Sequence, residues 1–472
     1  MVPADQGGGV MRTDLLAEPV AGLDEALAAV TAFDGVLTGG LLRPRPEQGA
    51  ALAEFADSVA GTPLAVRVCE AADKTAAAAG GEDHFAALAA ARTALLGSAH
   101  DALLARLDEA TGRTRSAAEA AVPGPPPAVN LLAAARSWLC DLARAGWQGI
   151  DHDLVADAAP VVTAMLPDPE LRRLATLLDG FSAELAASCP GAALDRVPAR
   201  RWADLWARAM ILAQPGASAA PPPGTATGRL LPLGIDLHEH ATAAQAQVHA
   251  VFDPADGSGA RLVRASVSAP KPDTVVGAGV WQLLRPHMSL LAAVGEGRAM
   301  NIADMTLTAG GDLLWDDAKA RTGEPADAFA TARVALPTAS AAAVHPLDRH
   351  PAAIAEPVFV EGYTAEETDR ELVFAFAGLR LAVDTDRIPA AGPLGPETVA
   401  ASRACIGLLR WDAGEFRLQP LAVETAVRNK PVAVHAGAWA GGAADKAAAK
   451  AEKAATDAVA VLRERAGKLL RK

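Results

Sequence analysis

The chain of 472 residues is long enough for about two to four domains, which excludes a small disulfide-stapled scaffold. Its formal net charge of −13 argues against a general nucleic-acid-binding protein, because neutralising a phosphate backbone requires a basic face. No segment reaches the roughly 18 to 20 clean apolar residues of a membrane-spanning helix, since Arg285, Pro286 and His287 interrupt the longest apolar stretch.

The cysteines and the first ten residues indicate in which cellular compartment the protein is expected. The cysteines are scattered singly, with no Cys-x-x-Cys motif, at Cys69, Cys140, Cys189 and Cys405. This spacing is typical of buried thiols in a reducing compartment rather than of disulfides or zinc knuckles. Residues 1–10 are polar and glycine-rich and lack the basic and apolar regions of a signal peptide. We therefore expect a cytoplasmic protein.

The N-terminal half carries apolar residues at helical spacing, after a short stretch, residues 1–22, that we expect to be flexible. Residues 23–213 are predicted to form an all-α domain. One helix should end at Gly146, another should open at Asp168, and a third should cover 200–210. Tryptophans lie on their apolar stripes, so we interpret these side chains as the core of a helical bundle.

The proline-rich segment 214–228 is predicted to be a linker, and beyond it the apolar period changes from 3.6 to 2. Alternating runs predict a three-stranded antiparallel meander with one apolar face, over residues 233–237, 248–252 and 262–267. Turn residues predict further hairpins over 305–315, 372–383 and 408–423. Residues 229–440 are therefore expected to form an α+β domain with antiparallel sheet. We find no internal repeat at a fixed period.

The best candidate for chemistry is a set of polar side chains on this meander. Asp236, His238 and His240 alternate along one strand and so share a face. A hairpin would bring His249 of the next strand near them. Two or three imidazoles with a carboxylate are sufficient ligands for zinc or a non-haem metal. The same pattern is typical of the solvent-facing side of an amphipathic hairpin, and we favour that interpretation.

Two acidic pairs could hold a divalent cation, Asp316 with Asp317 and Asp384 with Asp386. Adjacent residues of a strand point to opposite faces, which weakens the first pair, and the second is equally typical of a turn or a cap. The sequence contains no phosphate-binding loop, no complete dinucleotide-binding glycine motif and no Gly-x-Ser-x-Gly elbow. It therefore offers no nucleophile with a visible base.

Residues 441–472 are predicted to form a basic amphipathic helical tail. Within 446–472, eight Lys or Arg and three acidic residues give a local charge of +5, so the rest of the chain carries −18. The apolar stripe of this tail would consist of Val459, Leu462, Ala466 and Leu469. We interpret the tail as a solvated terminal helix. The alternatives are docking on an acidic protein, on this chain's own acidic body or, with less weight, on nucleic acid or a membrane surface.

Three stretches of the second half carry a resemblance: residues 283–291 (LLRPHMSLL), 301–305 (NIADM) and 314–317 (LWDD). Together they resemble uncharacterised actinobacterial proteins that are encoded beside a SWIM zinc-finger protein, a MoxR-type AAA ATPase and a von Willebrand A-domain protein. The resemblance includes no catalytic motif and carries over no functional residue. It implies an accessory role in a multi-protein assembly, with the ATPase or the von Willebrand A-domain protein as partner.

We therefore expect a non-enzymatic, intracellular interaction or accessory protein of a multi-protein bacterial assembly. The lack of catalytic motifs, the two-part layout and the oppositely charged tail motivate this hypothesis, which requires protein partners and no cofactor. The alternative is a metal-dependent enzyme in which the 236–249 hairpin holds a divalent metal. These two hypotheses differ in what the polar face of that hairpin should contact.

Overall fold

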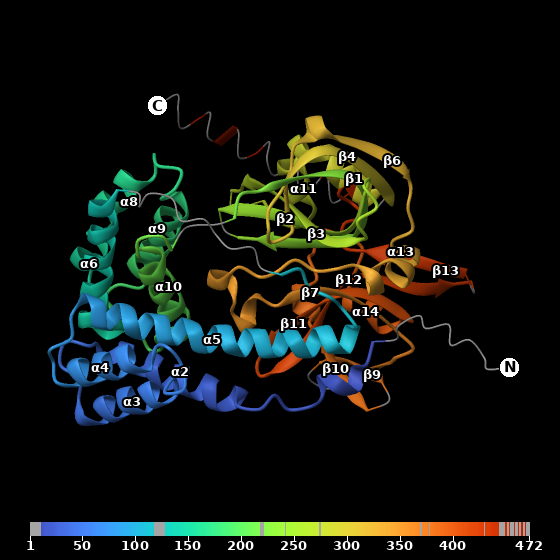
Figure 1. The fold of residues 1–472 in the computed structure, drawn as a ribbon. Helices are drawn as coiled ribbons and strands as arrows, with labels where there is room; N and C mark the ends of the chain where they lie inside the picture. The colour runs from blue at the N-terminus through green and yellow to red at the C-terminus, as the bar shows by residue number, and fades with distance from the viewer. Residues whose placement is uncertain are drawn as a thin grey trace.

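A computed structural model describes residues 11–442 apart from short gaps, together with a few residues of the tail (Figure 1). The gaps are 118–127, 218–220, 241, 273–274, 369–370, 377 and 429, and the described tail residues are 449, 450, 453, 457, 461, 464, 465 and 468. The predicted layout is confirmed, because a helical half precedes an α+β half that is rich in antiparallel strands. Among the described residues, no helix combines the length and apolarity that crossing a bilayer requires.

The N-terminal half is a bundle of helices around one apolar core. Its helices are α2 (Leu23–Gly39), α3 (Pro46–Asp57), α4 (Ala65–Ala76), α5 (Glu82–Thr111), α6 (Val129–Ala145), α7 (His152–Ala156), α8 (Ala158–Met165), α9 (Arg172–Ala187) and α10 (Ala199–Leu212). The three predicted helices correspond to α6, α9 and α10. Trp202 and Trp206 are fully buried, and the indole N–H of Trp206 donates to the carbonyl of Leu139 at 2.9 Å. The interpretation of these tryptophans as core residues is confirmed.

The strands that follow the helices close into a first barrel. They are β1 (Gly224–Glu239), β2 (Ala243–Pro254), β3 (Arg261–Pro270), β4 (Arg298–Leu307), β5 (Asp312–Leu314) and β6 (Ala320–Pro325). β1 pairs with both β2 and β4, while β3 pairs with β2 and, in parallel, with β5. Because β5 also pairs with β4, the order β1-β2-β3-β5-β4 is closed, and β6 lies outside it along β4. Helices α11 (Val280–Leu283) and α12 (Met288–Gly295) separate β3 from β4.

The remaining strands form a second barrel of the same topology. They are β7 (Ala355–Glu361), β8 (Thr364–Glu367), β9 (Leu372–Phe376), β10 (Leu379–Val383), β11 (Ala404–Asp412) and β12 (Glu415–Val427). β7 and β8 are two halves of one bent strand and pair with β11 and β9 respectively. β10 pairs in parallel with β12, which also pairs with β11, so the sheet closes. Helix α14 (Pro396–Ala400) separates β10 from β11, and β13 (Lys430–His435) pairs along β12.

Each barrel thus has five strands in one order, a single parallel pair and a helix between its third and fourth strands. This is the topology of an OB-fold, although topology alone does not define function. The parallel pairs β3–β5 and β10–β12 were not predicted, because they join strands that are not neighbours in sequence. The shared topology leaves no periodic signal in the sequence, because a barrel requires only alternating apolar residues and turns, and many different sequences satisfy both requirements.

The two barrels and the helical bundle are joined through α5 and α13 (Ala328–Val334). One apolar cluster draws from both barrels and α13 and includes Leu233, Phe329 and Ile406. The first half of α5 lies in the helical core, while its last turns, from Ala99, join the core of the second barrel. Figure 1 shows α5 running past β7 and β11. The segment predicted to be a linker already includes the start of β1 at Gly224.

A β-bulge determines which part of β1 faces the second barrel. The register between β1 and β2 shifts between Pro232 and Gly234, so Leu233 leaves the barrel interior and joins the cluster between the barrels. A Cβ atom at Gly234 would come within 2.7 Å of Leu421 Cβ. Glycine therefore permits β12 to approach β1 closely, and Asp236, the next outward side chain on β1, is covered by the second barrel.

The described part of the stretch 1–22, which begins at residue 11, is more ordered than predicted. Within the stretch expected to be flexible, α1 (Thr13–Leu16) is helical, and Leu15 and Leu16 are buried in the cluster that fills the second barrel. The amide of Arg12 donates to the carbonyl of Ala110 at 2.8 Å. A helix of four residues has too short a period to be recognised in sequence, and its order depends on this packing.

Deleting residues 443–472 is expected to leave the melting temperature nearly unchanged, because the described tail residues are helical and exposed. The predicted start of the tail at residue 441 is slightly early, since Ala440 is buried in the first barrel's core and Gly441 lies against Ala292. The predicted apolar stripe of the tail lies outside the described residues. Thermal unfolding followed by circular dichroism tests this, with a deletion from residue 439 as the destabilised control. A large loss of stability on deleting 443–472 would show that the tail is part of the core.

Candidate functional site

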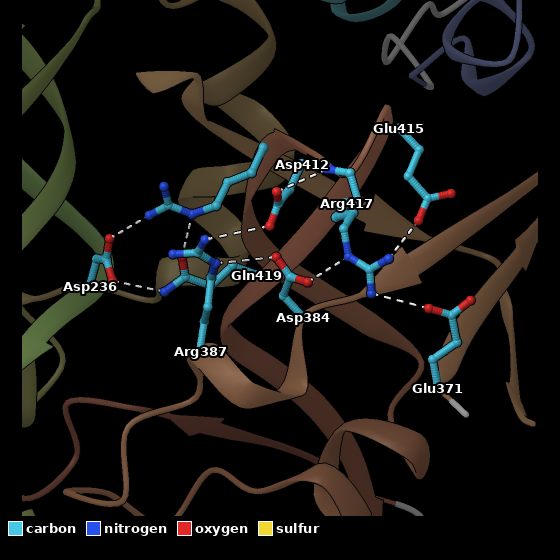
Figure 2. Close-up of polar contacts among 10 residues, drawn as sticks. Asp236, Glu371, Asp384, Arg387, Asp412, Glu415, Arg417 and Gln419 are labelled. Carbon is cyan, nitrogen blue, oxygen red and sulfur yellow. Dashed lines mark hydrogen bonds and ion pairs between the residues drawn. The ribbon is translucent and has the colours of Figure 1, made fainter. Parts of the chain in front are cut away.

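Asp236, the carboxylate of the predicted metal site, joins the two barrels. Its Oδ2 accepts a hydrogen bond from Arg410 Nη2 at 2.7 Å, and its Oδ1 accepts from Gln419 Nε2 at 2.8 Å (Figure 2). Arg410 Nε donates to Gln419 Oε1 at 2.6 Å, so the three side chains form a closed set. Asp236 is 3 % exposed. The favoured prediction that this face of β1 is solvated is therefore wrong for Asp236.

The ionisation of Asp236 reflects these contacts. Burial disfavours its charged form, but the hydrogen bond and charge of His238 and the charge of Arg410 outweigh burial and hold the pKa at about 2. His238 Nε2 lies 3.0 Å from Asp236 Oδ2. A carboxylate with this pKa is fully ionised at neutral pH, and its oxygens are already occupied by protein donors.

Of the predicted ligands, His238 contacts Asp236, but His240 does not join this pair. His240 is exposed at the end of β1, and its amide donates to Ala243 O at 2.8 Å. Among the described residues, no three His, Cys, Asp or Glu side chains are grouped so that they could hold a metal ion. Metal binding by this hairpin stays a prediction, and metal analysis of protein purified without a histidine tag would test it.

His249 is the fourth predicted ligand and has an unusual environment. It projects outward from β2 and is 0 % exposed, so it is buried between the barrels. The favoured prediction of a solvated side chain is therefore wrong for His249. Neither ring nitrogen has a hydrogen-bond partner within the described part of the chain. Burial lowers the pKa of His249 to about 3, so its imidazole is neutral at physiological pH.

Strand register places His249 in a row of residues across the first barrel. His249 on β2 lies opposite Gly234 on β1 and opposite Arg264 on β3, and Arg264 lies beside Asp312 on β5. Arg264 Nε and Nη2 donate to the carboxylate of Asp312 at 2.9 and 3.1 Å. A slip of one residue in either pairing would turn these side chains to the other face of the sheet.

This row forms one wall of a cavity of about 240 Å³, which we call the junction cavity. Its opposite walls come from α5, from the connection between the barrels and from the start of β7, and they include His100, Arg115, His345 and Glu356. The cavity lies over the β2–β3 face beside the β4–β5 loop, the region through which OB-folds commonly bind ligands. Three separate parts of the molecule therefore meet at one polar site.

Ion pairs hold α5 against this cavity. Arg113 Nη1 lies 3.0 Å from Glu356 Oε2, and Arg115 Nη2 lies 3.2 Å from the same oxygen. Arg115 also donates twice to Asp108, at 2.7 and 2.9 Å. Burial would raise the pKa of Glu356, but the charges of Arg115 and Arg113 hold it below its usual value. The segment after α5 is thereby fixed to the first residues of β7.

In the predicted acidic pairs, Asp384, Asp316 and Asp317 have protein partners. Asp384 Oδ1 accepts from Arg417 Nε at 2.6 Å, and Arg417 also binds Glu371 and Glu415, as Figure 2 shows. The guanidinium of Arg417 therefore lies where a divalent cation bound to Asp384 would have to lie. Asp316 Oδ1 accepts from the amide of Ala318 at 2.9 Å, and Asp317 Oδ1 accepts from the indole N–H of Trp315 at 2.8 Å. These two carboxylates have separate local partners.

The four cysteines are all free thiols. Cys140 and Cys405 are buried as predicted, whereas Cys189 is half-buried and Cys69 is exposed. Burial raises the pKa of the Cys140 thiol to about 11, and burial also raises the pKa of Cys405. These two thiols are therefore protonated at neutral pH and suit packing rather than nucleophilic chemistry.

A second candidate site is a β-ribbon at the edge of the second barrel. β12 pairs with β11 only as far as Glu424, but it pairs with β13 as far as Val427. Beyond Glu424 the two strands continue as a ribbon of exposed and half-buried residues, which we define as residues 425–428 and 430–435 and which Figure 1 shows projecting from the barrel. Val432 is 39 % exposed, and β13 has no second neighbour strand within the described residues.

Sequence reasoning missed several residues of the junction cavity, including His100, Arg115, Arg264 and Glu356. They come from α5, from the segment after it and from both barrels, so no spacing in the sequence links them. The alternation of polar and apolar residues identified His249 as a residue of the polar face. The same alternation places Arg264 on the polar face of its strand, so the sequence did contain a signal for Arg264. Nothing local indicated that α5 would lie across this face.

A scan against protein-family models finds no match to this chain, and searches of curated proteins and of solved structures find none either. The functional argument therefore depends on the geometry of the chain itself.

Proposed function

We propose that this chain is a non-enzymatic accessory protein that works inside the cell and binds another protein through the ribbon. The observation that carries the proposal is the exposed outer edge of β13, which has no strand partner among the described residues. Unpaired main-chain groups on an exposed edge are a ready template for an added strand. The expected partner contributes an extended segment that pairs along this edge.

The residues of the ribbon define the chemistry of the partner segment. Pro431 has no backbone N–H and Lys430 is a charged edge residue, and both features limit pairing near the tip. Pairing is therefore directed to residues 432–435, where the exposed Val432 and Ala433 offer a small apolar surface. Arg428 and Lys430 make the tip cationic. The complementary segment is extended and apolar, with acidic residues opposite the tip.

The interior of the molecule supports a scaffold role. The charged side chains buried between its parts are engaged with one another: Asp236 with Arg410 between the barrels, and Glu356 with Arg113 after α5. These groups hold the parts in fixed relation, which gives the ribbon a rigid base. The AAA ATPase and the von Willebrand A-domain protein implied by the resemblance are the first partners to examine.

We expect Val432→Asp to abolish recovery of the partner in affinity purification from the native host, because a buried carboxylate in an added strand is unfavourable. Val66→Asp is the matched control, since Val66 on α4 is 81 % exposed and far in sequence from the ribbon. Ala433→Pro is a second ribbon variant, which removes one edge N–H. The same three variants are compared in binding assays with the purified ATPase and the von Willebrand A-domain protein.

The proposal predicts one specific pattern. A partner is recovered with the wild type and with Val66→Asp, and is lost with Val432→Asp and with Ala433→Pro. Equal recovery with all four proteins would show that the ribbon is not the binding site. Repeated recovery of the wild-type chain alone would reject an accessory role.

A further inference from the structure

His249 is a buried polar residue whose ring nitrogens are left without hydrogen bonds by the described residues packed around it. It is fully buried at the wall of the junction cavity, and both ring nitrogens are unpartnered within the described residues. Leaving buried polar atoms unsatisfied costs stability that an apolar side chain of similar volume would retain. Such local conflicts are characteristic of functional sites, where a ligand supplies the missing hydrogen bonds.

The histidines of the opposite wall have definite hydrogen-bonding roles. His345 Nδ1 accepts from the amide of Leu347 at 3.3 Å, so Nε2 carries the proton and can donate. His100 Nδ1 lies 2.9 Å from Asp101 Oδ1 and donates to it. In a neutral His100 ring, Nε2 is then an acceptor. One wall of the cavity therefore offers both a donor and an acceptor.

The row across the first barrel also offers donors and acceptors. Asp312 holds the guanidinium of Arg264 in place through Nε and Nη2, while Nη1 has no partner in the described part of the chain. The neutral ring of His249 supplies one further donor and one further acceptor. These groups are held by sheet register before any ligand arrives, so little ordering is needed on binding.

The charged groups around the cavity neutralise one another. The pairs are Arg264 with Asp312, Arg115 with Asp108, Arg113 with Glu356, Arg173 with Asp348 and Arg349 with Asp101. With no excess positive charge, this wall does not favour an anion. Among the described residues, no Phe, Tyr or Trp lines the cavity, so a nucleobase would lack the large aromatic rings on which bases usually stack. Apolar patches come from Leu262, Val344 and Ile354.

We propose that the junction cavity binds a small, uncharged, hydroxyl-rich molecule of about monosaccharide size. Every hydroxyl both donates and accepts, which matches the mixed wall, and the C–H faces of such a molecule would pack on the apolar patches. The volume of about 240 Å³ lies just under the usual range of ligand pockets, which begins near 300 Å³, and suits one small ligand. In the complex, His249 and Arg264 Nη1 hydrogen-bond to ligand hydroxyls. This site is independent of the ribbon and goes beyond the proposed function.

Isothermal titration calorimetry of the full chain tests the proposal, with D-glucose, D-galactose, D-ribose and myo-inositol as probes. Inorganic phosphate and adenosine serve as comparators of other chemistry. We expect saturable one-to-one binding of at least one of the four polyols. His249→Leu and Arg264→Gln should each weaken that binding about tenfold, the effect of one lost hydrogen bond. Arg321→Gln is the control, because Arg321 is exposed and donates only to backbone carbonyls.

A cavity-filling variant, Ala343→Leu, separates ligand binding from structural effects. It leaves every polar group of the wall in place but occupies the space, so it should also weaken binding. Circular dichroism confirms that each variant is folded before titration. The proposal is overturned if none of the four polyols binds, if phosphate or adenosine binds instead, or if His249→Leu and Ala343→Leu bind as the wild type does.

Discussion

Replacing Arg410 by methionine is expected to lower the free energy of unfolding by about 3–5 kcal/mol, because it leaves the buried carboxylate of Asp236 without its arginine partner. Gln419 and His238 remain beside the carboxylate, so the expected loss is that of the guanidinium at 2.7 Å alone. Urea unfolding followed by tryptophan fluorescence measures the change. The loss should be concentrated at the contact between the barrels, since Asp236 belongs to the first and Arg410 to the second.

Two comparisons make this result specific. Arg380→Met removes an arginine whose side chain is 58 % exposed and paired with Glu366, and its expected cost is only about 0–1 kcal/mol. A double variant that replaces both Asp236 and Arg410 by leucine should recover most of the loss, because no charge is left buried. A cost for Arg410→Met no larger than for Arg380→Met would show that Asp236 does not depend on this pair.

Mild acid is expected to destabilise the folded protein, and His249 should account for roughly 3 kcal/mol of the loss between pH 6.5 and pH 4. Burial lowers the folded pKa of His249 to about 3, whereas the unfolded ring has the ordinary value near 6.5. Between these two pH values the unfolded chain takes up a proton that the folded chain does not. Stability is therefore fully present above pH 6.5 and is lost as the pH falls toward 3.

The charged neighbours of His249 act on its pKa in both directions, and burial remains the largest effect. The charge of Asp236 favours a protonated ring, as does that of Glu356, whereas the charges of Arg264 and Arg410 disfavour it. Asp236 itself, with a pKa of about 2, loses its contribution only below about pH 4, where its unfolded carboxyl becomes protonated. The histidine and carboxylate contributions can therefore be separated by the pH at which each appears.

Urea unfolding of His249→Leu at pH 7, 6, 5 and 4 provides the measurement. The variant should be at least as stable as the wild type at pH 7 and should lose less stability as the pH falls. His100 and His435, whose pKa values burial also lowers, account for part of the remaining slope. An unchanged slope in His249→Leu would mean that the ring is solvated in solution. A more stable variant that has lost its ligand would show directly that His249 is retained for binding.

The junction cavity and the ribbon are separate sites, so one molecule can bind a small ligand at the first and a protein at the second. The cavity lies where α5, the first barrel and the second barrel meet, and the ribbon extends from the second barrel. Because the ion pairs of Arg113 and Arg115 fix the segment after α5 to Glu356, the walls of the cavity are held in place from three directions. The two sites can be tested independently because no residue named in one experiment is altered in the other.

The local pattern of the sequence was sufficient to predict most secondary structure. Helical spacing predicted α6, α9 and α10, and alternation predicted the β1–β2–β3 meander and three later hairpins. Turn glycines were informative because Gly378 and Gly414 have φ values of +94° and +89°, which favour glycine over other residues. These features depend on residues close in the chain, so their signal is local.

Only the tertiary structure decided which polar faces would be buried. Alternation placed Asp236 and His249 on the polar side of the meander, but an exposed face and a face covered by another domain have the same period. The second barrel covers this side because Gly234 admits Leu421, and closure of each barrel depends on strands that are distant in sequence. The environment of a buried polar residue is set by such long-range contacts. For that reason the sequence identified His249 as a candidate but not the cavity that it lines.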